Sequence, residues 1–337
     1  MKNHDTLRGK MKLTKEQLES ILIGAVSVSE ENGVFSLSRF TEKQEAYYKE
    51  KSPLDLHRKV FASAGMRLDF LTDADALSFD FYVISASSRT FYSFDLYIDG
   101  IFCDELYVMN FTRKKEGTVS FPLPEGTHRV TLYFPNLMRT DIADLTAAGA
   151  SFVKPTERKT KLLFLGDSIT QGYDAYHSSL SYTNRVAHAL DADILNQAIG
   201  GEVFDADILD ENLPFDPETV IVAYGTNDWA LKPSFEALIE AAERFFTRIR
   251  EIYPQKKMLF ISPIWRGKTE GADFPTGSFE QTAKALSDLA AQKGFLTVDG
   301  FRLTPHHSDF FADQYLHPND LGFAFYAENL LNILKKI

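Results

Sequence analysis

Four separated segments of the sequence combine residue types that can do acyl-transfer chemistry. The first is Gly166-Asp167-Ser168, which follows the apolar residues 161–165 and precedes a helical pattern. A serine in a strand-to-helix turn lies beside outward-pointing backbone N–H groups, which suits a nucleophile whose own amide stabilises an oxyanion. A serine at such a turn also serves simply as a helix cap. Taken alone, this segment leaves both interpretations open.

Glycine and amide side chains follow the next two apolar runs. Gly200 and Gly201 come after residues 192–195, and Asn227 comes after residues 219–224. Paired glycines let a backbone N–H approach a ligand closely, and an asparagine amide can donate to a developing oxyanion. An ordinary loop turn and an Asx-turn are the simpler alternatives for these two segments.

A histidine in extended backbone lies near the end of the chain. His317 precedes Pro318, and a proline disfavours helix in the residue before it. A histidine on a rigid turn near a serine acts as a general base, and a neighbouring carboxylate holds its tautomer. A lone histidine of this kind is more often structural, so His317 gains meaning only together with Ser168.

Together the four segments resemble the SGNH, or GDSL-type, hydrolases, a family named for Ser, Gly, Asn and His in four separated blocks. The matching residues are Ser168, Gly201, Asn227 and His317, in that order. The resemblance implies that Ser168 is the nucleophile and His317 the general base. It also implies an oxyanion hole made of the Ser168 and Gly201 N–H groups and the Asn227 side chain. Gly200 is the alternative to Gly201.

The acidic member of the family's triad departs from the usual spacing. The family places an aspartate three residues before the histidine, but residue 314 is glutamine and the carboxylate is Asp313, four residues before. Asp313 reaches His317 if the loop bulges by one residue. Otherwise Asp309 or a main-chain carbonyl orients the imidazole, as in dyad members of the family.

Several further residues are candidates for the substrate pocket. Tyr173, Trp229 and Trp265 follow the first, third and fourth apolar runs, and Asp167 precedes the nucleophile. Flat aromatic faces suit sugar rings, although an aromatic residue at a strand end is more often packing. The pair His306-His307 lacks matching carboxylates at metal-ligand spacing, so we expect neither a metal nor another cofactor.

The elements that position these residues alternate between strands and helices. The near-continuous apolar runs are typical of strands covered on both faces, as in a parallel sheet. We expect five such strands, at residues 161–165, 192–195, 219–224, 258–262 and 296–298. Interleaved with helices, they predict a three-layer α/β/α domain with a doubly wound, flavodoxin-like parallel sheet. Ligands of such sheets bind beyond the carboxyl ends of the strands, where all four segments lie.

The N-terminal half has a different pattern. Residues 66–70, 77–83 and 91–98 alternate in polarity, which indicates half-buried strands, and Asp99-Gly100 is a strong hairpin signal. Further strands are expected at residues 118–122 and 128–134. Many short strands with regular turns predict an antiparallel β-sandwich of jelly-roll type. We therefore divide the chain into a β domain at residues 1–155 and an SGNH domain at 156–337.

Composition narrows the classes of partner. The 337 residues carry 36 Lys and Arg against 47 Asp and Glu, a net charge of −11, which disfavours nucleic acid. Cys103 is the only cysteine, so cysteine-based metal sites and internal disulfides are excluded. The apolar residues 21–26 form too short a run for a membrane span or a signal segment. We expect a cytoplasmic protein without membrane partners, either monomeric or a homo-oligomer.

The sequence therefore predicts a two-domain serine esterase. A β domain joined to an SGNH domain resembles the architecture of carbohydrate esterases that remove acetyl groups, such as carbohydrate esterase family 2. We expect a small or oligosaccharide ester as substrate and acetyl as the acyl group. The alternatives are a lipase, lysophospholipase or thioesterase of the same fold, and an inactive carbohydrate-binding protein.

Overall fold

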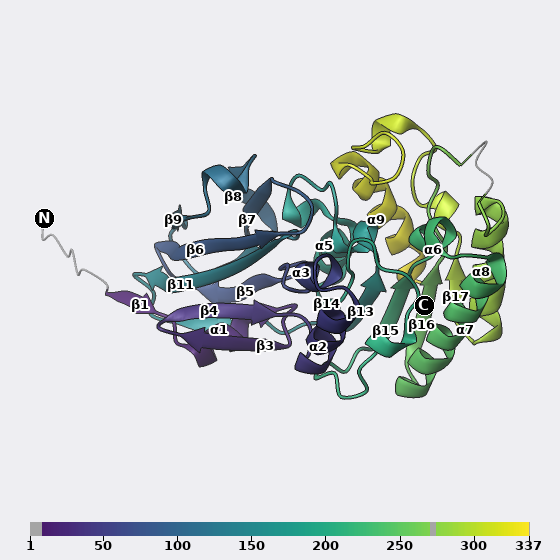
Figure 1. Ribbon diagram of the computed structural model, residues 1–337. Helices are drawn as coiled ribbons and strands as arrows, with labels where there is room; N and C mark the ends of the chain where they lie inside the picture. Colours follow the sequence, from purple (N-terminus) through teal and green to yellow (C-terminus); the bar gives the residue numbers. More distant parts are fainter. Residues whose placement is uncertain (1–8, 270–273, 337) are drawn as a thin grey trace, which may run out of the picture.

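Three β-sheets organise the molecule in a computed structural model, which describes residues 9–269 and 274–336. Within these residues two sheets are antiparallel with six strands each, and the third is parallel with five strands. The antiparallel sheets lie together in the N-terminal half, and the parallel sheet lies beside them in the C-terminal half (Figure 1). This confirms the predicted fold class.

The two antiparallel sheets form a sandwich around one apolar core. One sheet contains β1 (Lys10–Lys12), β3 (Ser27–Glu31), β4 (Val34–Ser38), β6 (Ala76–Ala86), β9 (Glu116–Pro122) and β11 (Met138–Ala148). The other contains β2 (Leu22–Ile23), β5 (Arg67–Thr72), β7 (Tyr92–Ile98), β8 (Ile101–Val108), β10 (His128–Tyr133) and β12 (Val153–Pro155). Alternate residues of both sheets, such as Phe79 and Phe94, face inward and are fully buried. Asp99 and Gly100 both have positive φ and join β7 to β8, as the hairpin prediction requires.

The parallel sheet has the strand order β14-β13-β15-β16-β17. Its strands are β13 (Thr160–Gly166), β14 (Ala192–Asn196), β15 (Thr219–Ala223), β16 (Lys257–Ile261) and β17 (Leu296–Val298). The long helices beside it are α5 (Tyr182–Leu190), α7 (Phe235–Ile252), α8 (Phe279–Gln292) and α9 (Asp320–Leu334). Side chains of α5 and α9 share one core cluster with the sheet, and those of α7 and α8 share another. Strand order reverses between β13 and β15, which is where doubly wound sheets bind their ligands.

Short helices connect these elements. They are α1 (Lys15–Ile21), α2 (Glu42–Lys51), α3 (Leu56–Val60), α4 (Ser168–Gln171), α6 (Thr226–Leu231), and the 3-10 turns η1 (Phe111–Arg113), η2 (Ser178–Leu180), η3 (Ala206–Ile208), η4 (Gly300–Arg302) and η5 (Ser308–Phe310). Helices α4 and α6 begin directly after β13 and β15, so they carry the two segments that the sequence singled out. No helix in the described ranges is long and apolar enough to cross a membrane.

Helices α2 and α3 belong to the N-terminal half of the sequence but pack on the parallel sheet. They lie between the sandwich and the parallel sheet (Figure 1), and Tyr48, Leu56 and Val60 share a buried cluster with Leu163 and Val222. The predicted boundary after residue 155 falls between β12 and β13, which belong to different sheets. The N-terminal half thus completes one helical layer of the C-terminal half, and this layer borders the candidate site.

Candidate active site

Ser168 and His317, 149 residues apart in sequence, are in hydrogen-bond contact. Strand β13 ends at Gly166, and Ser168 is the first residue of α4. The turn is tight, since a Cβ on Gly166 would lie 2.4 Å from Thr170 Oγ1. Ser168 Oγ lies 2.9 Å from His317 Nε2. This is the contact between nucleophile and base that acyl transfer requires.

Asp313 contacts the other ring nitrogen of His317. Its Oδ2 lies 2.8 Å from His317 Nδ1, and its Oδ1 accepts backbone N–H groups of Tyr315, Leu316 and His317 itself. Gln314 has a φ of +69°, and this left-handed residue forms the extra turn that brings Asp313 into reach. Burial opposes ionisation of Asp313, but the hydrogen bonds from His317 and the backbone outweigh it and hold the pKa of Asp313 well below its usual range.

The alternative carboxylate from the sequence, Asp309, lies at the surface, whereas another carboxylate lies near His317. The carboxylate of Asp309 is 80% exposed and lies 3.6 Å from His307. A different carboxylate, Asp174, was not anticipated and places its Oδ2 3.6 Å from His317 Nδ1. Arg89 of the N-terminal half grips Asp174 with two hydrogen bonds of 2.6 and 2.8 Å. The sequence around Asp174 does not predict its position beside His317, because its partner Arg89 is 85 residues away.

Two donors proposed for an oxyanion hole follow β14 and β15: Gly201 lies in a loop and Asn227 lies in α6. Asn227 Nδ2 donates to the Glu202 carbonyl at 2.9 Å, which fixes the amide and leaves its second N–H available. Gly200 N–H donates to Gln171 Oε1 at 2.7 Å and is therefore already engaged. Gly201 is exposed, has a φ of +91°, and its N–H has no acceptor among the residues that the structure describes. Of the two glycine N–H groups, that of Gly200 is engaged and that of Gly201 is available to a ligand.

The four residues assigned to substrate contact lie in different environments. Tyr173 is 4% exposed, stacks on His317 with ring centres 5.6 Å apart, and bonds Ser87 through its hydroxyl. Trp229 is 1% exposed, packs against Phe274 and Phe279, and donates its indole N–H to Gly277. Trp265 is half-buried and stacks on His306. Asp167 is 3% exposed and accepts the Ile169 N–H. Trp229 and Asp167 thus present no open face to a ligand in this structure.

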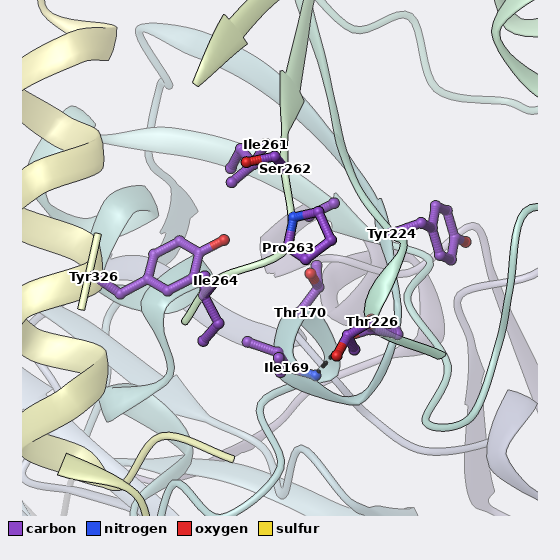
Figure 2. A pocket seen from close by; sticks show the side chains of 11 residues that line it. Ile169, Thr170, Tyr224, Thr226, Ile261, Ser262, Pro263, Ile264 and Tyr326 are labelled. Atoms are coloured by element: carbon purple, nitrogen blue, oxygen red, sulfur yellow. Dashed lines mark hydrogen bonds between the residues drawn. The ribbon is translucent and has the colours of Figure 1, made fainter. Parts of the chain in front are cut away.

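Two buried carboxyl groups lie behind the nucleophile turn. Burial raises the pKa of Asp167 to about 7, and the charge of Asp228 adds to this effect. Burial likewise raises the pKa of Asp228 to about 7, and its Oδ2 has no hydrogen-bond partner within the described ranges. Asp167 borders a cavity of about 20 Å³, enough for about one water molecule, which is also lined by Thr170, Thr226 and Tyr326 (Figure 2).

Replacing Asp228 with asparagine is expected to stabilise the fold at pH 8 and not at pH 4. The pKa of Asp228 is higher in the folded state than the ordinary value of 3.8, so wild-type stability falls as pH rises through 4 to 7 and the loss is complete above pH 7. Asparagine removes this penalty, and we expect a gain of about 1–3 kcal/mol at pH 8. Urea unfolding at both pH values measures it, with Asp309→Asn as the exposed control. An equal effect at pH 4 and pH 8 would contradict the assignment.

Two groups of side chains in the described ranges have ligand atoms close enough to hold a metal ion. One consists of Asp174, Asp313 and His317, in which His317 Nδ1 lies 2.8 Å from Asp313 and 3.6 Å from Asp174. The other consists of Asp95, Glu105 and His177, where His177 Nδ1 lies 2.9 Å from Glu105 and 3.4 Å from Asp95. In both, the imidazole Nδ1 already lies close to carboxylate oxygens of the same group.

Comparison with known families shows which protein family the C-terminal half matches. Residues 164–325 match the model of the GDSL-like lipase/acylhydrolase family, and this span contains Ser168, Gly201, Asn227 and His317. The chain carries a GDSL-like lipase/acylhydrolase domain. The resemblance of this half to the GDSL-type hydrolases is therefore confirmed at the level of the family. The GDSL-like domain supports a hydrolase. No curated protein sequence matches the chain.

Solved structures share the fold of the whole chain, including the β-sandwich that precedes the GDSL-like domain. The salicylyl-acyltransferase SsfX3 from a tetracycline biosynthetic pathway superposes with a TM-score of 0.80 at 19% identity, covering 99% of this chain and 98% of that chain. A family two carbohydrate esterase from Cellvibrio japonicus has a TM-score of 0.65 at 17% identity, covering 97% and 98%. The acetyl xylan esterase Est2A from Butyrivibrio proteoclasticus has a TM-score of 0.61 at 15% identity, covering 97% of each chain. At these identities the likeness establishes the two-part architecture.

Proposed function

We propose that this protein is a serine esterase that removes short acyl groups, chiefly acetyl, from carbohydrate esters. The observation that carries the proposal is the relay from Ser168 Oγ through His317 to Asp313, with consecutive contacts of 2.9 and 2.8 Å. The match of residues 164–325 to an acylhydrolase family supports the same class of reaction.

The proposed reaction has two balanced halves. His317 Nε2 takes the Ser168 proton while Oγ bonds to the ester carbonyl carbon, and the negative charge moves to the carbonyl oxygen. The Ser168 and Gly201 N–H groups and the free Asn227 N–H receive that charge. His317 then gives its proton to the departing alcohol, which leaves an acyl-serine. Water repeats the sequence, with His317 again as base and then as acid, and releases the carboxylic acid.

Asp313 keeps the imidazole in the tautomer that this reaction needs. Because its Oδ2 accepts the proton on His317 Nδ1, Nε2 is left unprotonated and able to accept from Ser168. The carboxylate is fixed by three backbone N–H groups on its other oxygen, so it does not have to reorganise when the imidazolium forms.

The preference for a short acyl group and for sugar esters rests on the neighbours in fold. Two neighbours in fold are named as a family two carbohydrate esterase and an acetyl xylan esterase, which supports sugar esters as the substrate class. Preference for acetyl and for sugars is thus part of the proposal.

The acyl-chain preference is tested with 4-nitrophenyl esters from acetyl to decanoyl. We expect kcat/KM to be highest for acetyl and to fall by about tenfold or more by octanoyl, because the proposed site prefers a short acyl group. The Ser168→Ala protein supplies the background rate for each ester. A maximum at long chains would favour the lipase, lysophospholipase or thioesterase alternative.

Water is the proposed acceptor of the acyl group. SsfX3 is named as an acyltransferase, and an acyl-serine can in principle pass its acyl group to another alcohol. The test measures the products of 4-nitrophenyl acetate with and without added glycerol or methyl glycosides. Release of acetate and 4-nitrophenol in equal amounts under both conditions supports hydrolysis. Loss of free acetate in favour of an acetylated sugar would instead indicate transfer. Binding of sugars without any turnover would support the inactive carbohydrate-binding alternative.

A further inference from the structure

A groove with a volume of about 460 Å³ opens beside the triad, and residues of the N-terminal half form it. It is lined by the turn before α3 and α3 itself, by the end of β6 with the residues that follow, and by the stretch from Phe111 to Lys115. Four cationic side chains lie along it: Arg58, Lys59, Arg89 and Lys115. We call it the basic groove. Its volume lies in the range of sites that take small-molecule ligands.

The basic groove meets the candidate active site on two sides. Lys59 Nζ donates to the Gly200 carbonyl at 2.7 Å, and a Cβ placed on Gly201 would lie 3.6 Å from the same nitrogen. Arg89 binds Asp174, whose carboxylate lies 3.6 Å from His317 Nδ1. Two residues of the groove, Lys59 and Arg89, therefore contact the surroundings of the proposed oxyanion donor and of the base.

Its charge is opposite to that of the chain as a whole. The protein has a net charge of −11, yet the groove lining contains four cations and a single carboxylate, Asp55. Lys59 pairs with Asp55 at 2.6 Å, and Arg89 pairs with Asp174 at 2.6 Å. Arg58 and Lys115 are exposed and form no ion pair with any residue that the structure describes. Two cations of the groove thus remain without an acidic partner.

Exposed apolar side chains lie beside these cations. Leu54 is 84% exposed and Ile84 is 53% exposed, and both line the groove. A ligand that covers them while placing a negative charge near Arg58 and Lys115 would use both properties. A ring bearing an anionic group has this shape and chemistry.

We propose that the basic groove binds an anionic group, a carboxylate or a phosphate, on the alcohol part of the ester substrate. This inference rests on the proposed esterase function and narrows its substrate class. The alcohol oxygen must lie within reach of His317, which returns its proton, and the Arg89 end of the groove borders that histidine through Asp174. The small acyl group needs no such space. The N-terminal half thereby supplies the specificity of the site.

Three aryl acetates that differ in one substituent test the inference. They are methyl 4-acetoxybenzoate, which is neutral, 4-acetoxybenzoate, which carries a carboxylate, and 4-acetoxyphenyl phosphate. Their kcat/KM values are measured for wild type, for the double variant Arg58→Gln/Lys115→Gln, and for an α8 control, Lys284→Gln/Lys293→Gln. This control loses one lysine charge within α8 and one at the residue directly after it. The ratio of anionic to neutral kcat/KM within each protein removes differences in intrinsic ester reactivity.

We expect this ratio to fall about tenfold in the Arg58→Gln/Lys115→Gln protein and to stay within twofold of wild type in the α8 control. In wild type the ratio is expected to fall as salt rises from 20 to 500 mM. Which anion loses more in the double variant tells whether the groove suits a carboxylate or a phosphate. An unchanged ratio, or the same fall in the control, overturns the inference.

A binding measurement separates failure of the inference from failure of the proposed function. NMR titration of the Ser168→Ala protein with 4-hydroxybenzoate needs no hydrolysis, and we expect binding that weakens about tenfold when Arg58 and Lys115 are also replaced. Hydrolysis of the neutral ester without this charge-dependent binding leaves the esterase proposal intact and removes the groove. Charge-dependent binding without any Ser168-dependent hydrolysis removes the esterase proposal and the assignment of the anion to a leaving alcohol.

Discussion

Replacing Ser168 with alanine is expected to lower kcat/KM for 4-nitrophenyl acetate by at least about 10⁴-fold. The substitution removes the atom that would bond to the carbonyl carbon, and the remaining oxyanion donors alone give little rate. Ser168 is 5% exposed and its hydroxyl bonds His317, so a small residue fits the site without displacing the fold.

The matched control for this variant is Ser287→Ala. Ser287 lies on α8, where its hydroxyl donates to the Ala283 carbonyl of its own helix. We expect it to retain the wild-type rate, and far-UV circular dichroism and thermal unfolding to be alike for all three proteins. A Ser168→Ala protein that keeps more than a tenth of the wild-type rate would exclude Ser168 as the nucleophile.

Replacing Asp313 with asparagine is expected to cost about 10³–10⁴-fold in kcat. Asparagine has one acceptor oxygen, and three backbone N–H groups already point at the Oδ1 position. The amide NH₂ therefore faces His317 Nδ1, which must then be unprotonated to accept this hydrogen bond, so the ring proton lies on Nε2. In that tautomer His317 cannot take the proton of Ser168.

Asp309→Asn is the control for this prediction, because it removes a carboxylate from the same loop without touching His317. We expect it to be fully active. A second variant, Asp313→Asn/Asp174→Asn, tests whether Asp174 partly replaces Asp313 at a distance of 3.6 Å from Nδ1. If Asp313→Asn alone retains wild-type kcat, Asp313 is not the group that orients the imidazole.

The lowered pKa of Asp313 also fixes the sign of its pH effect. Its carboxylate is stabilised in the folded state, so the contribution of Asp313 to stability is fully present above its ordinary value of 3.8 and is lost as pH falls below that value. Asp313 therefore stays ionised throughout the neutral range. Loss of activity between pH 5 and 7 has to come from another group.

The sequence was sufficient for the fold class and for the contact between Ser168 and His317. The alternation of apolar runs with helical segments predicts the parallel sheet. Because ligands of such sheets bind beyond the carboxyl ends of the strands, we expect Ser168, Asn227 and His317 to lie at that edge. Each of these residues has a simpler explanation when taken alone. Their agreement in order and in position after strands made the resemblance to SGNH hydrolases specific.

Features that depend on distant side chains could not be predicted in this way. Asp313 reaches His317 despite its unusual spacing because Gln314 takes a left-handed conformation. Glutamine is not a residue type that predicts a left-handed conformation. Trp229 looks available because it follows a strand, but Phe274 and Phe279 cover it from about 50 residues away in the chain. The sequence around Trp229 contains no information on Phe274 or Phe279.

The contribution of the N-terminal half was hidden for the same reason. Its alternating strands predict a separate sandwich, whereas α2 and α3 complete a layer of the parallel sheet, and Arg89 reaches Asp174 beside His317. Such contacts join segments more than 80 residues apart, and no periodicity within either segment reports them. The two halves therefore form one site, although their sequence patterns are separate.

Labelling with a small alkyl fluorophosphonate tests the central claim most directly. Such reagents react with a serine that is activated by a neighbouring base, and they mimic the tetrahedral intermediate. Intact-mass and peptide mass spectrometry are expected to find one adduct per chain, on Ser168, with none on Ser168→Ala and a strongly slowed reaction on His317→Ala. A wild-type protein that gains no adduct, or gains it at another serine, would contradict the account.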